Sequence, residues 1–437
     1  MFNELRVAIR MLAASWVVFL AFPAQAQMLD DNAVADELEK PGYAEHDLNH
    51  SLPQRDSLLG ALLLPDDYED WKEDLYKETT LKLSLSYQGN TMRASSVANG
   101  QDYAAAGFLL LEAQWTPLNF DEDYEGGVVF SYNNVHTWGN AAQPPLFFFN
   151  TGSMFVHDAL FLDVDPFVAN LYWEQWLKKD RFHLRIGQHV PVSVIDFSRF
   201  ADVRTSVSNP TIGFPANVIP FGPPAMGVTA KLAPASPTGF YATGHVSDIN
   251  SRVDELNVGN IFDTGDVFVA GEFGYNWARM GADGPELDHL HLLVFRASRA
   301  SEKFFPTSSG WGFKVAGEKQ FGKWVTLASY AYNTAAGGGF GYTSLQHVVN
   351  VGAAYTKPFG IKGEAFAALT WGKELDEGQC GVVPCFGRDQ VMLETYYKIL
   401  TTPNLWITPG LQVHFDPVNN PETDVIWVPM LKFRVFF

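Results

Sequence analysis

Apolar and polar residues alternate along most of the chain, starting at about residue 79. In the segment 81–88 every odd position is apolar and every even position is polar. Successive side chains of a β-strand point to opposite faces, so this period predicts strands with one apolar and one polar face. The same period is clear in the segments 126–138, 182–188, 310–318, 346–356, 390–398, 404–415 and 424–437.

A weaker form of the pattern extends the predicted strands over the rest of residues 79–437. It occurs at 106–117, 167–177, 224–233, 239–247, 266–277, 286–297, 323–333 and 362–373. The total is about sixteen strands, and no helix-period run of comparable strength interrupts them.

The connections between the predicted strands alternate between short and long. Tight turns are predicted at 177–181, 233–239 and 319–323. Longer connections, rich in Gly, Pro, Asn and Ser, are predicted at 139–165, 189–223, 248–265, 298–309, 334–345 and 374–389. Transmembrane β-barrels have short turns at one end and long outer loops at the other. We therefore predict an all-β fold, a transmembrane antiparallel β-barrel of about sixteen strands over residues 79–437.

A soluble β-sandwich or propeller is the alternative, and three features argue against it. No blade-like repeat is evident. The final strand is apolar at every second position apart from Pro429 and ends on Phe437, which predicts a contact with the barrel assembly machinery. Aromatic residues stand near strand ends, as the interfacial girdles of membrane barrels require, at Tyr87, Trp115, Trp138, Trp324, Tyr355 and Trp427.

The first residues have the features of a secretory signal peptide, predicted over 1–26. Arg6 and Arg10 precede an apolar core at 11–22, and an Ala-Gln-Ala cleavage signal ends at Ala26. The alternative is a transmembrane anchor, for which the apolar core is short. The prediction is export in a Gram-negative bacterium to the outer membrane. Residues 27–78 are then an acidic periplasmic or lumenal segment with one short helix at 68–78.

Composition excludes several classes of protein. The 437 residues are 47% hydrophobic, 14% aromatic and only 18% charged, which argues against intrinsic disorder. The formal net charge of −19, without a dense basic cluster, excludes a nucleic-acid-binding surface. Mean hydropathy of −0.06 is too polar for a multi-helix membrane protein. The acidity predicts either a cation-selective channel or carboxylates that divalent ions bridge to lipopolysaccharide and outer-membrane lipids.

Cys380 and Cys385 are the two cysteines of the chain. Export permits disulfides, and the spacing predicts a disulfide that closes a short loop, with free thiols as the alternative. Two cysteines alone cannot make a tetrahedral zinc site.

A barrel of sixteen strands leaves an aqueous channel, lined by the residues opposite the apolar face. By parity the lining includes Ser84, Gln88, His183, Arg185, Lys314, Glu318, Asn350, Glu394, Lys398, Gln412, His414, Lys432 and Arg434. Positive and negative side chains are mixed. Such a wall favours polar neutral solutes over anions or cations.

Two stretches resemble the carbohydrate-selective porins of the OprB type. One is the hairpin 170–188, which reads NLYWEQW, then KKD, then RFHLRIGQ. The other is the C-terminal stretch, with LETYY at 393–397, LWITPGLQ at 405–412, FDP at 415–417 and Arg434 before Phe437. The resemblance implies a sixteen-stranded outer-membrane barrel that passes monosaccharides and small oligosaccharides by facilitated diffusion. It implies no cofactor and no catalysis, and it leaves both a monomer and a homotrimer open.

Charged and amide side chains that bind sugar hydroxyls would form the constriction of such a channel. Glu174 and Arg185 lie on one predicted hairpin, and both are expected to face the lumen. The predicted substrate-binding residues are Glu174, Arg185, Glu394, Gln412, Lys432 and Arg434. The alternative for each is a solvated wall charge balanced by a neighbour. The connection 142–155 could narrow the channel further or pack on itself outside.

Other functions remain as alternatives. A general or ion-selective porin would share the whole pattern, and a hydrophobic-solute transporter would need an apolar plug that residues 27–78 do not offer. An enzyme embedded in the barrel would need chemistry that the recognisable motifs do not supply. His289 and His291 share a strand face and could begin a metal site, but Asp288 points to the opposite face and Asp283 lies in a loop. We therefore predict no metal there.

Overall fold

The computed structural model describes most of the chain from residue 57 onward. The described residues are 57–59, 68–121, 124–178, 181–190, 194–196, 198, 203–213, 224–234, 236–252, 256, 265–281, 284–300, 308–334, 345–360, 362–376, 385 and 387–437. The predicted signal peptide and most of the acidic segment that follows it lie outside these residues.

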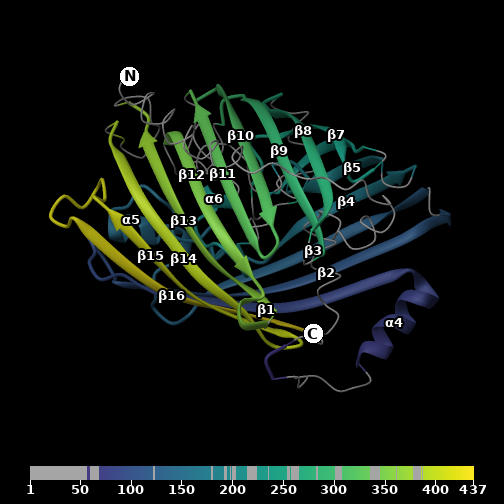
Figure 1. The fold of residues 1–437 in the computed structure, drawn as a ribbon, viewed down its shortest axis with the longest axis horizontal. Helices are drawn as coiled ribbons and strands as arrows, with labels where there is room; N and C mark the ends of the chain where they lie inside the picture. The colour runs from purple at the N-terminus through teal and green to yellow at the C-terminus, as the bar shows by residue number, and fades with distance from the viewer. Residues whose placement is uncertain are drawn as a thin grey trace.

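Sixteen antiparallel strands in the described part of the chain close into one barrel (Figure 1). Each strand pairs with its neighbours in sequence, and β1 pairs with β16 to close the ring. The strands are β1 (Leu81–Arg93), β2 (Tyr103–Asp121), β3 (Tyr124–Thr137), β4 (Phe167–Leu177), β5 (Phe182–His189), β6 (Ala225–Leu232), β7 (Gly239–Asp248), β8 (Val267–Gly281), β9 (Gly284–Ala297), β10 (Gly310–Phe321), β11 (Trp324–Asn333), β12 (Leu345–Thr356), β13 (Gly363–Glu374), β14 (Asp389–Thr402), β15 (Leu405–Phe415) and β16 (Val425–Phe436). Every segment with the alternating pattern is a strand, so the predicted barrel is confirmed.

Helices are few and short among the described residues. They are α4 (Tyr68–Thr79), α5 (Phe147–Thr151), α6 (Pro210–Gly213), and the 3₁₀ turns η1 (Pro144–Leu146) and η4 (Pro358–Gly360). None of the helices in the described part of the chain is long and apolar enough to cross a bilayer. The short helix predicted at 68–78 is confirmed as α4, and Lys72 Nζ donates to the main-chain oxygen of Phe437 at 2.6 Å. This contact attaches the helix to the end of the closing strand.

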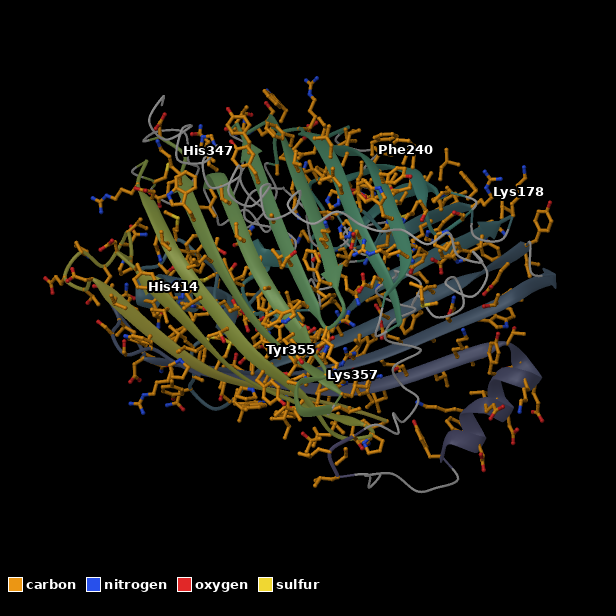
Figure 2. All side chains as sticks on the ribbon, viewed as in Figure 1. Lys178, Phe240, His347, Tyr355, Lys357 and His414 are labelled. Carbon is orange, nitrogen blue, oxygen red and sulfur yellow. The ribbon has the colours of Figure 1, made fainter. Side chains whose placement is uncertain are left out.

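The two faces of the wall differ as the alternation requires. Outward side chains are apolar and exposed, as at Leu369 and Trp427, which are 54% and 50% exposed. Of the residues labelled in Figure 2, Phe240 is 63% exposed and His414 is 0% exposed. The inward parity is confirmed by buried polar residues on every side of the ring, including Ser84, Gln88, Arg185, Lys314, Glu318, Asn350, Glu394, Gln412, His414, Lys432 and Arg434.

Two of the connections that the structure describes fold into the barrel. We call residues 151–161, between β3 and β4, the first inward segment, and residues 203–213, between β5 and β6, the second inward segment. Both are buried almost throughout. Phe155 of the first and Val207 of the second are 0% exposed and belong to one apolar cluster with inward residues of the wall.

The position of the second inward segment differs from the sequence-based expectation. The sequence predicts a long connection at 189–223, rich in Pro, Ser and Asn, of the kind that forms outer loops in barrels. Residues 203–213 instead lie against the inner wall, because polar wall side chains bond their backbone and apolar wall residues pack on Val203 and Ile212. The expectation that 142–155 could narrow the lumen agrees with the burial of Phe147 and Phe155 at 0% exposure.

Candidate channel lining

The hairpin β4–β5 carries a buried ion pair on its inward face. Glu174 and Arg185 lie on adjacent strands, as expected. They are also register partners, and Arg185 Nη2 lies 2.7 Å from Glu174 Oε1. His183 Nε2 donates to the same oxygen at 2.6 Å, and the Arg185 guanidinium lies 5.0 Å from the centre of the Tyr172 ring. Glu174 and Arg185 are 2% and 1% exposed. The tight turn of the hairpin therefore places opposite charges side by side on the lumenal wall.

The other four predicted site residues form a second group, on strands β14 to β16. Glu394 and Gln412 are register partners, and Gln412 Nε2 donates to Glu394 Oε2 at 2.9 Å. Lys432 and Arg434 face inward from β16, where Arg434 Nη2 donates to Ser86 Oγ at 3.1 Å across the closing seam. The structure thus brings the six predicted residues to two places on the wall.

Gln412 holds the first inward segment. Its amide oxygen accepts a hydrogen bond from His157 Nδ1 at 2.7 Å, and its amide nitrogen donates to the main-chain oxygen of His157 at 3.0 Å. Its remaining amide hydrogen goes to Glu394. Ser153 of the same segment hydrogen-bonds His414 Nδ1 at 2.9 Å. These contacts occupy both amide donors of Gln412, so its side chain is positioned by the segment as well as by the wall.

Glu394 holds the second inward segment. Its carboxylate accepts the backbone N–H of Ser208 at 2.5 Å and that of Asn209 at 3.0 Å. Thr408 Oγ1 on β15 donates to the main-chain oxygen of Thr205 at 2.9 Å. Irregular backbone inside a barrel needs such partners, because a buried N–H or C=O without one is costly. Polar wall residues therefore supply the hydrogen bonds that a neighbouring strand would otherwise provide.

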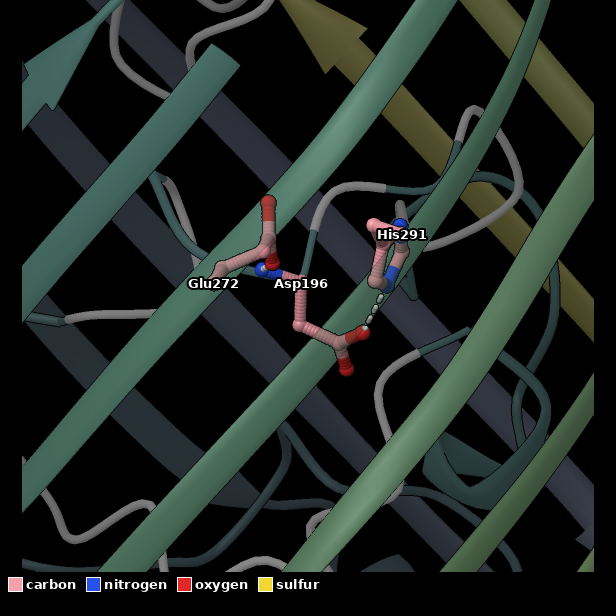
Figure 3. A group of neighbouring side chains, drawn as sticks. All are labelled: Asp196, Glu272 and His291. Carbon is pink, nitrogen blue, oxygen red and sulfur yellow. Dashed lines mark hydrogen bonds and ion pairs between the residues drawn. The ribbon is translucent and has the colours of Figure 1, made fainter. Parts of the chain in front are cut away.

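A third polar group lies on β8 to β10, where Asp196 from the β5–β6 connection meets Glu272 and His291 (Figure 3). One ligand atom from each lies within 4.8 Å of the others, and all three residues are buried. Within the described residues this is the group whose side chains could surround a metal ion. The sequence suggested His291 as a possible ligand, and the parity of Asp288, on the opposite face, was correct. It did not suggest Asp196 or Glu272, because an aspartate in a long irregular connection has no pattern that indicates where it will lie.

Lys314 on β10 forms an ion pair with Asp196 of this third group. Its ammonium lies 2.7 Å from Asp196 Oδ1 and 2.8 Å from Asp196 Oδ2, and it also donates to the main-chain oxygen of Gly213 at 3.3 Å. His291 Nε2 contacts Asp196 Oδ1 at 3.0 Å. A cation already sits on the carboxylate that a metal would need. We therefore interpret the group as an ion-pair network that attaches the β5–β6 connection to the wall.

His157 gives the first inward segment a pH dependence. Burial lowers the pKa of its imidazole to about 4 from the usual 6.5, with the hydrogen bond to Gln412 opposing the shift. The His157 imidazole binds a proton less tightly when the segment is attached to the wall than when it is detached. The attachment is therefore fully present above about pH 6.5 and weakens as the pH falls towards about 4. The protection factors of the amides in residues 152–161, which are exchange rates corrected for the intrinsic effect of pH, should therefore fall over that interval.

The His157→Gln variant is the control for this pH dependence, because glutamine does not titrate. Asp158 also titrates in the segment, and comparing the two proteins isolates the contribution of His157. Identical pH profiles for the variant and the parent protein would contradict the assignment.

The structure describes one cysteine of the predicted disulfide, Cys385. Cys385 is 3% exposed and disulfide-bonded. Cys380 lies outside the described residues, so the pairing of Cys380 with Cys385 stays a prediction.

Comparison with solved structures finds proteins of similar fold. The high-pH structure of OprB from Pseudomonas putida is 12% identical to this chain, with a TM-score of 0.63 over 85% of this chain and 97% of that one. The low-pH structure of the same protein gives a TM-score of 0.49 at 12% identity, over 88% and 99%. Salmonella typhi OmpF in complex with daunomycin gives 0.46 at 9% identity, over 81% and 97%. No protein-family model and no curated protein matches the chain. The first likeness shows that this sixteen-stranded barrel has the fold of OprB.

Proposed function

We propose that this protein is an outer-membrane porin through which carbohydrates, such as glucose and small oligosaccharides, diffuse passively. The observation that carries the proposal is the inner wall, where acids, bases and amides alternate within hydrogen-bonding distance instead of forming a face of one sign. The Glu174–Arg185 pair is the clearest case. The likeness to OprB in fold supports the proposal, together with the resemblance of the hairpin 170–188 to carbohydrate-selective porins.

The wall chemistry suits a neutral solute with many hydroxyl groups. Ionised partners form shorter and stronger hydrogen bonds to hydroxyls than neutral partners do. A channel must also release its solute, so several weak contacts serve better than one tight site. We propose that Glu174, Arg185 and Arg434, which are buried in the unloaded barrel, contact the sugar when the passage opens. Glu394, Gln412 and Lys432 would act chiefly by holding the inward segments that shape the passage.

Location and assembly belong to the same proposal. The apolar outer face would contact outer-membrane lipids and lipopolysaccharide, and Phe437 would be recognised by the barrel assembly machinery. A monomer and a homotrimer both remain compatible with the barrel. The proposal includes no catalytic step, because a porin passes its solute unchanged.

Liposome swelling tests the solute class. Proteoliposomes that contain the barrel are diluted into isotonic glucose, maltose, succinate or lysine, and the swelling rates are compared. The proposal predicts faster swelling in glucose than in succinate or lysine. Equal rates for all small solutes would indicate a general porin, and faster entry of lysine would indicate a cation-selective one. Absence of swelling from a folded barrel would favour an enzyme or a hydrophobic-solute transporter.

A charge placed on the outer face tests the membrane location. Leu369 lies near the middle of β13 and is 54% exposed, so Leu369→Arg should reduce the free energy of unfolding from lipid vesicles by about 2–4 kcal/mol. Ala365 lies on the same outer face nearer the short-turn end of β13. The matched variant Ala365→Arg should cost only about 0–1 kcal/mol, because it lies close to the interface. Equal costs in urea titrations would contradict a bilayer around this wall.

A further inference from the structure

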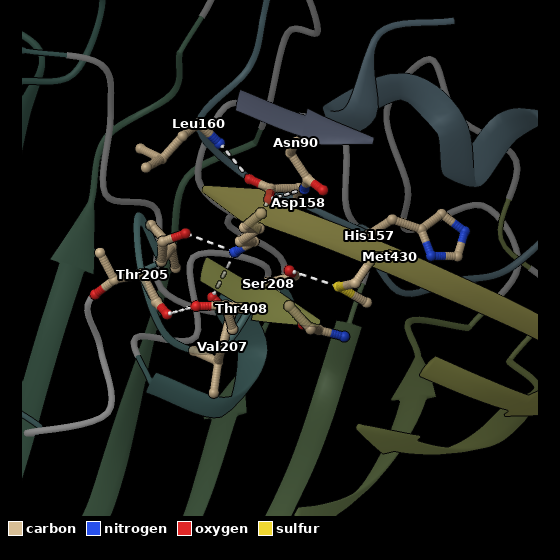
Figure 4. Close-up of polar contacts among 12 residues, drawn as sticks. Asn90, His157, Asp158, Leu160, Thr205, Val207, Ser208, Thr408 and Met430 are labelled. Atoms are coloured by element: carbon tan, nitrogen blue, oxygen red, sulfur yellow. Dashed lines mark hydrogen bonds and ion pairs between the residues drawn. The ribbon is translucent and has the colours of Figure 1, made fainter. Parts of the chain in front are cut away.

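Lys432 is the one wall residue whose described polar contacts reach both inward segments. Figure 4 labels Asp158 of the first segment and Val207 of the second, which both take part in these contacts. Its ammonium lies 3.3 Å from Asp158 Oδ2 of the first inward segment. It donates to the main-chain oxygens of Val203, at 2.6 Å, and Val207, at 3.2 Å, in the second. An ammonium has three hydrogens, and three acceptors surround this one. Lys432 is 1% exposed, so these bonds form away from solvent.

Asp158 ties the first inward segment firmly to this point. Its Oδ2 also accepts from Asn90 Nδ2 at 2.6 Å, and its Oδ1 accepts the backbone N–H of Leu160 at 3.0 Å. Asn90 on β1 and Lys432 on β16 are register partners across the seam that closes the barrel. Asp158 is 0% exposed, and burial raises the pKa of its carboxyl while the Lys432 ammonium opposes the rise. Separation from Lys432 would therefore leave a buried acid without its cation.

The second inward segment has its own attachments besides Lys432. Glu394 accepts the N–H groups of Ser208 and Asn209, and Lys314 bonds Gly213 and the upstream Asp196. The first segment is attached through Gln412 and Asn90. Each segment is thus attached to the wall by residues that do not contact the other segment in the described polar contacts. Lys432 is the residue that both segments share.

We infer that Lys432 couples the two inward segments, so that release of one from the wall promotes release of the other. When the second segment leaves, Val203 and Val207 withdraw their carbonyls from the ammonium. The ammonium then has two hydrogens without these acceptors, and the water that hydrates them also weakens its attraction to Asp158. The channel therefore has a single joint opening motion instead of two independent ones. This inference holds whether or not the permeating solute is a sugar, because it concerns the apo barrel.

The test uses Lys314→Met, which removes an anchor of the second segment and has no described polar contact with the first. Amide exchange is followed by mass spectrometry for peptides from 151–161 and 203–213 in the full-length barrel in detergent. With Lys432 present, Lys314→Met should accelerate exchange in both segments, with the first changing by about two- to thirtyfold. In the Lys432→Met background, the same substitution should accelerate exchange in 203–213 only.

A second background keeps the inference testable if Lys432→Met does not fold, which heat-dependent gel mobility would reveal. Asp158→Asn breaks the bridge from the other side, and in that background Lys314→Met should again affect 203–213 alone. If Lys314→Met leaves 151–161 unchanged in the parent protein, the segments open independently and the inference fails. If it accelerates both segments in every background, the shared apolar cluster carries the coupling and Lys432 does not.

Discussion

Arg185→Ala is expected to destabilise the folded barrel by about 3–5 kcal/mol, the usual cost of breaking a buried ion pair from one side. The substitution leaves the Glu174 carboxylate, which is 2% exposed, with His183 as its remaining polar partner of the hairpin. The packing of the guanidinium against Tyr172 is lost as well. Urea unfolding in lipid vesicles, or the temperature at which the folded gel band disappears, measures the effect.

The double variant Glu174→Gln with Arg185→Met is the control for this prediction. It removes both charges and keeps similar volumes, so it should be much closer to the parent protein in stability. Its glucose permeation should nevertheless fall, because both proposed sugar contacts are changed. If Arg185→Ala unfolds like the parent protein, the pair is not desolvated as the structure places it.

Glu394→Ala is expected to detach the second inward segment from the wall and increase single-channel conductance. The carboxylate accepts the N–H groups of Ser208 and Asn209, and each buried N–H left without a partner costs about 1–3 kcal/mol. Gln412 also loses the acceptor of one amide hydrogen. The segment is therefore expected to spend more of its time away from β14, which widens the passage.

Glu364→Ala is the matched comparison, because Glu364 also faces the second inward segment. It accepts hydrogen bonds from Ser206 Oγ and Tyr396 OH, which are side-chain hydroxyls that can turn to other partners. In these contacts its removal leaves no backbone N–H without an acceptor, so the conductance should change less than in Glu394→Ala. Equal conductance changes in the two variants would contradict the special role of the backbone contacts.

The regular part of the molecule could be predicted from the sequence. Period-two alternation located every strand and assigned Arg185, Glu394 and Lys432 to the inner face, because a strand has only two faces. The short turn at 177–181 placed Glu174 beside Arg185, because a tight hairpin fixes the register of its strands.

The irregular part could not be predicted in the same way. Asp158 and Asp196 lie in connections without periodicity, and their roles depend on where a long loop folds. Gln412 is a lumenal residue by parity, but nothing in β15 alone indicates that its amide bonds His157. The sequence therefore identified residues that line the barrel, and the structure showed which of them hold the loops.

Single-channel recording in a planar bilayer, with sugars added to the bath, tests the central claim most directly. A carbohydrate channel predicts stable ion steps that millimolar glucose or a related sugar reduces, while equal amounts of succinate or phosphate do not. Stable steps that no sugar affects would contradict the proposed selectivity while keeping the porin barrel. Absence of steps from a folded, membrane-inserted barrel would contradict the channel itself.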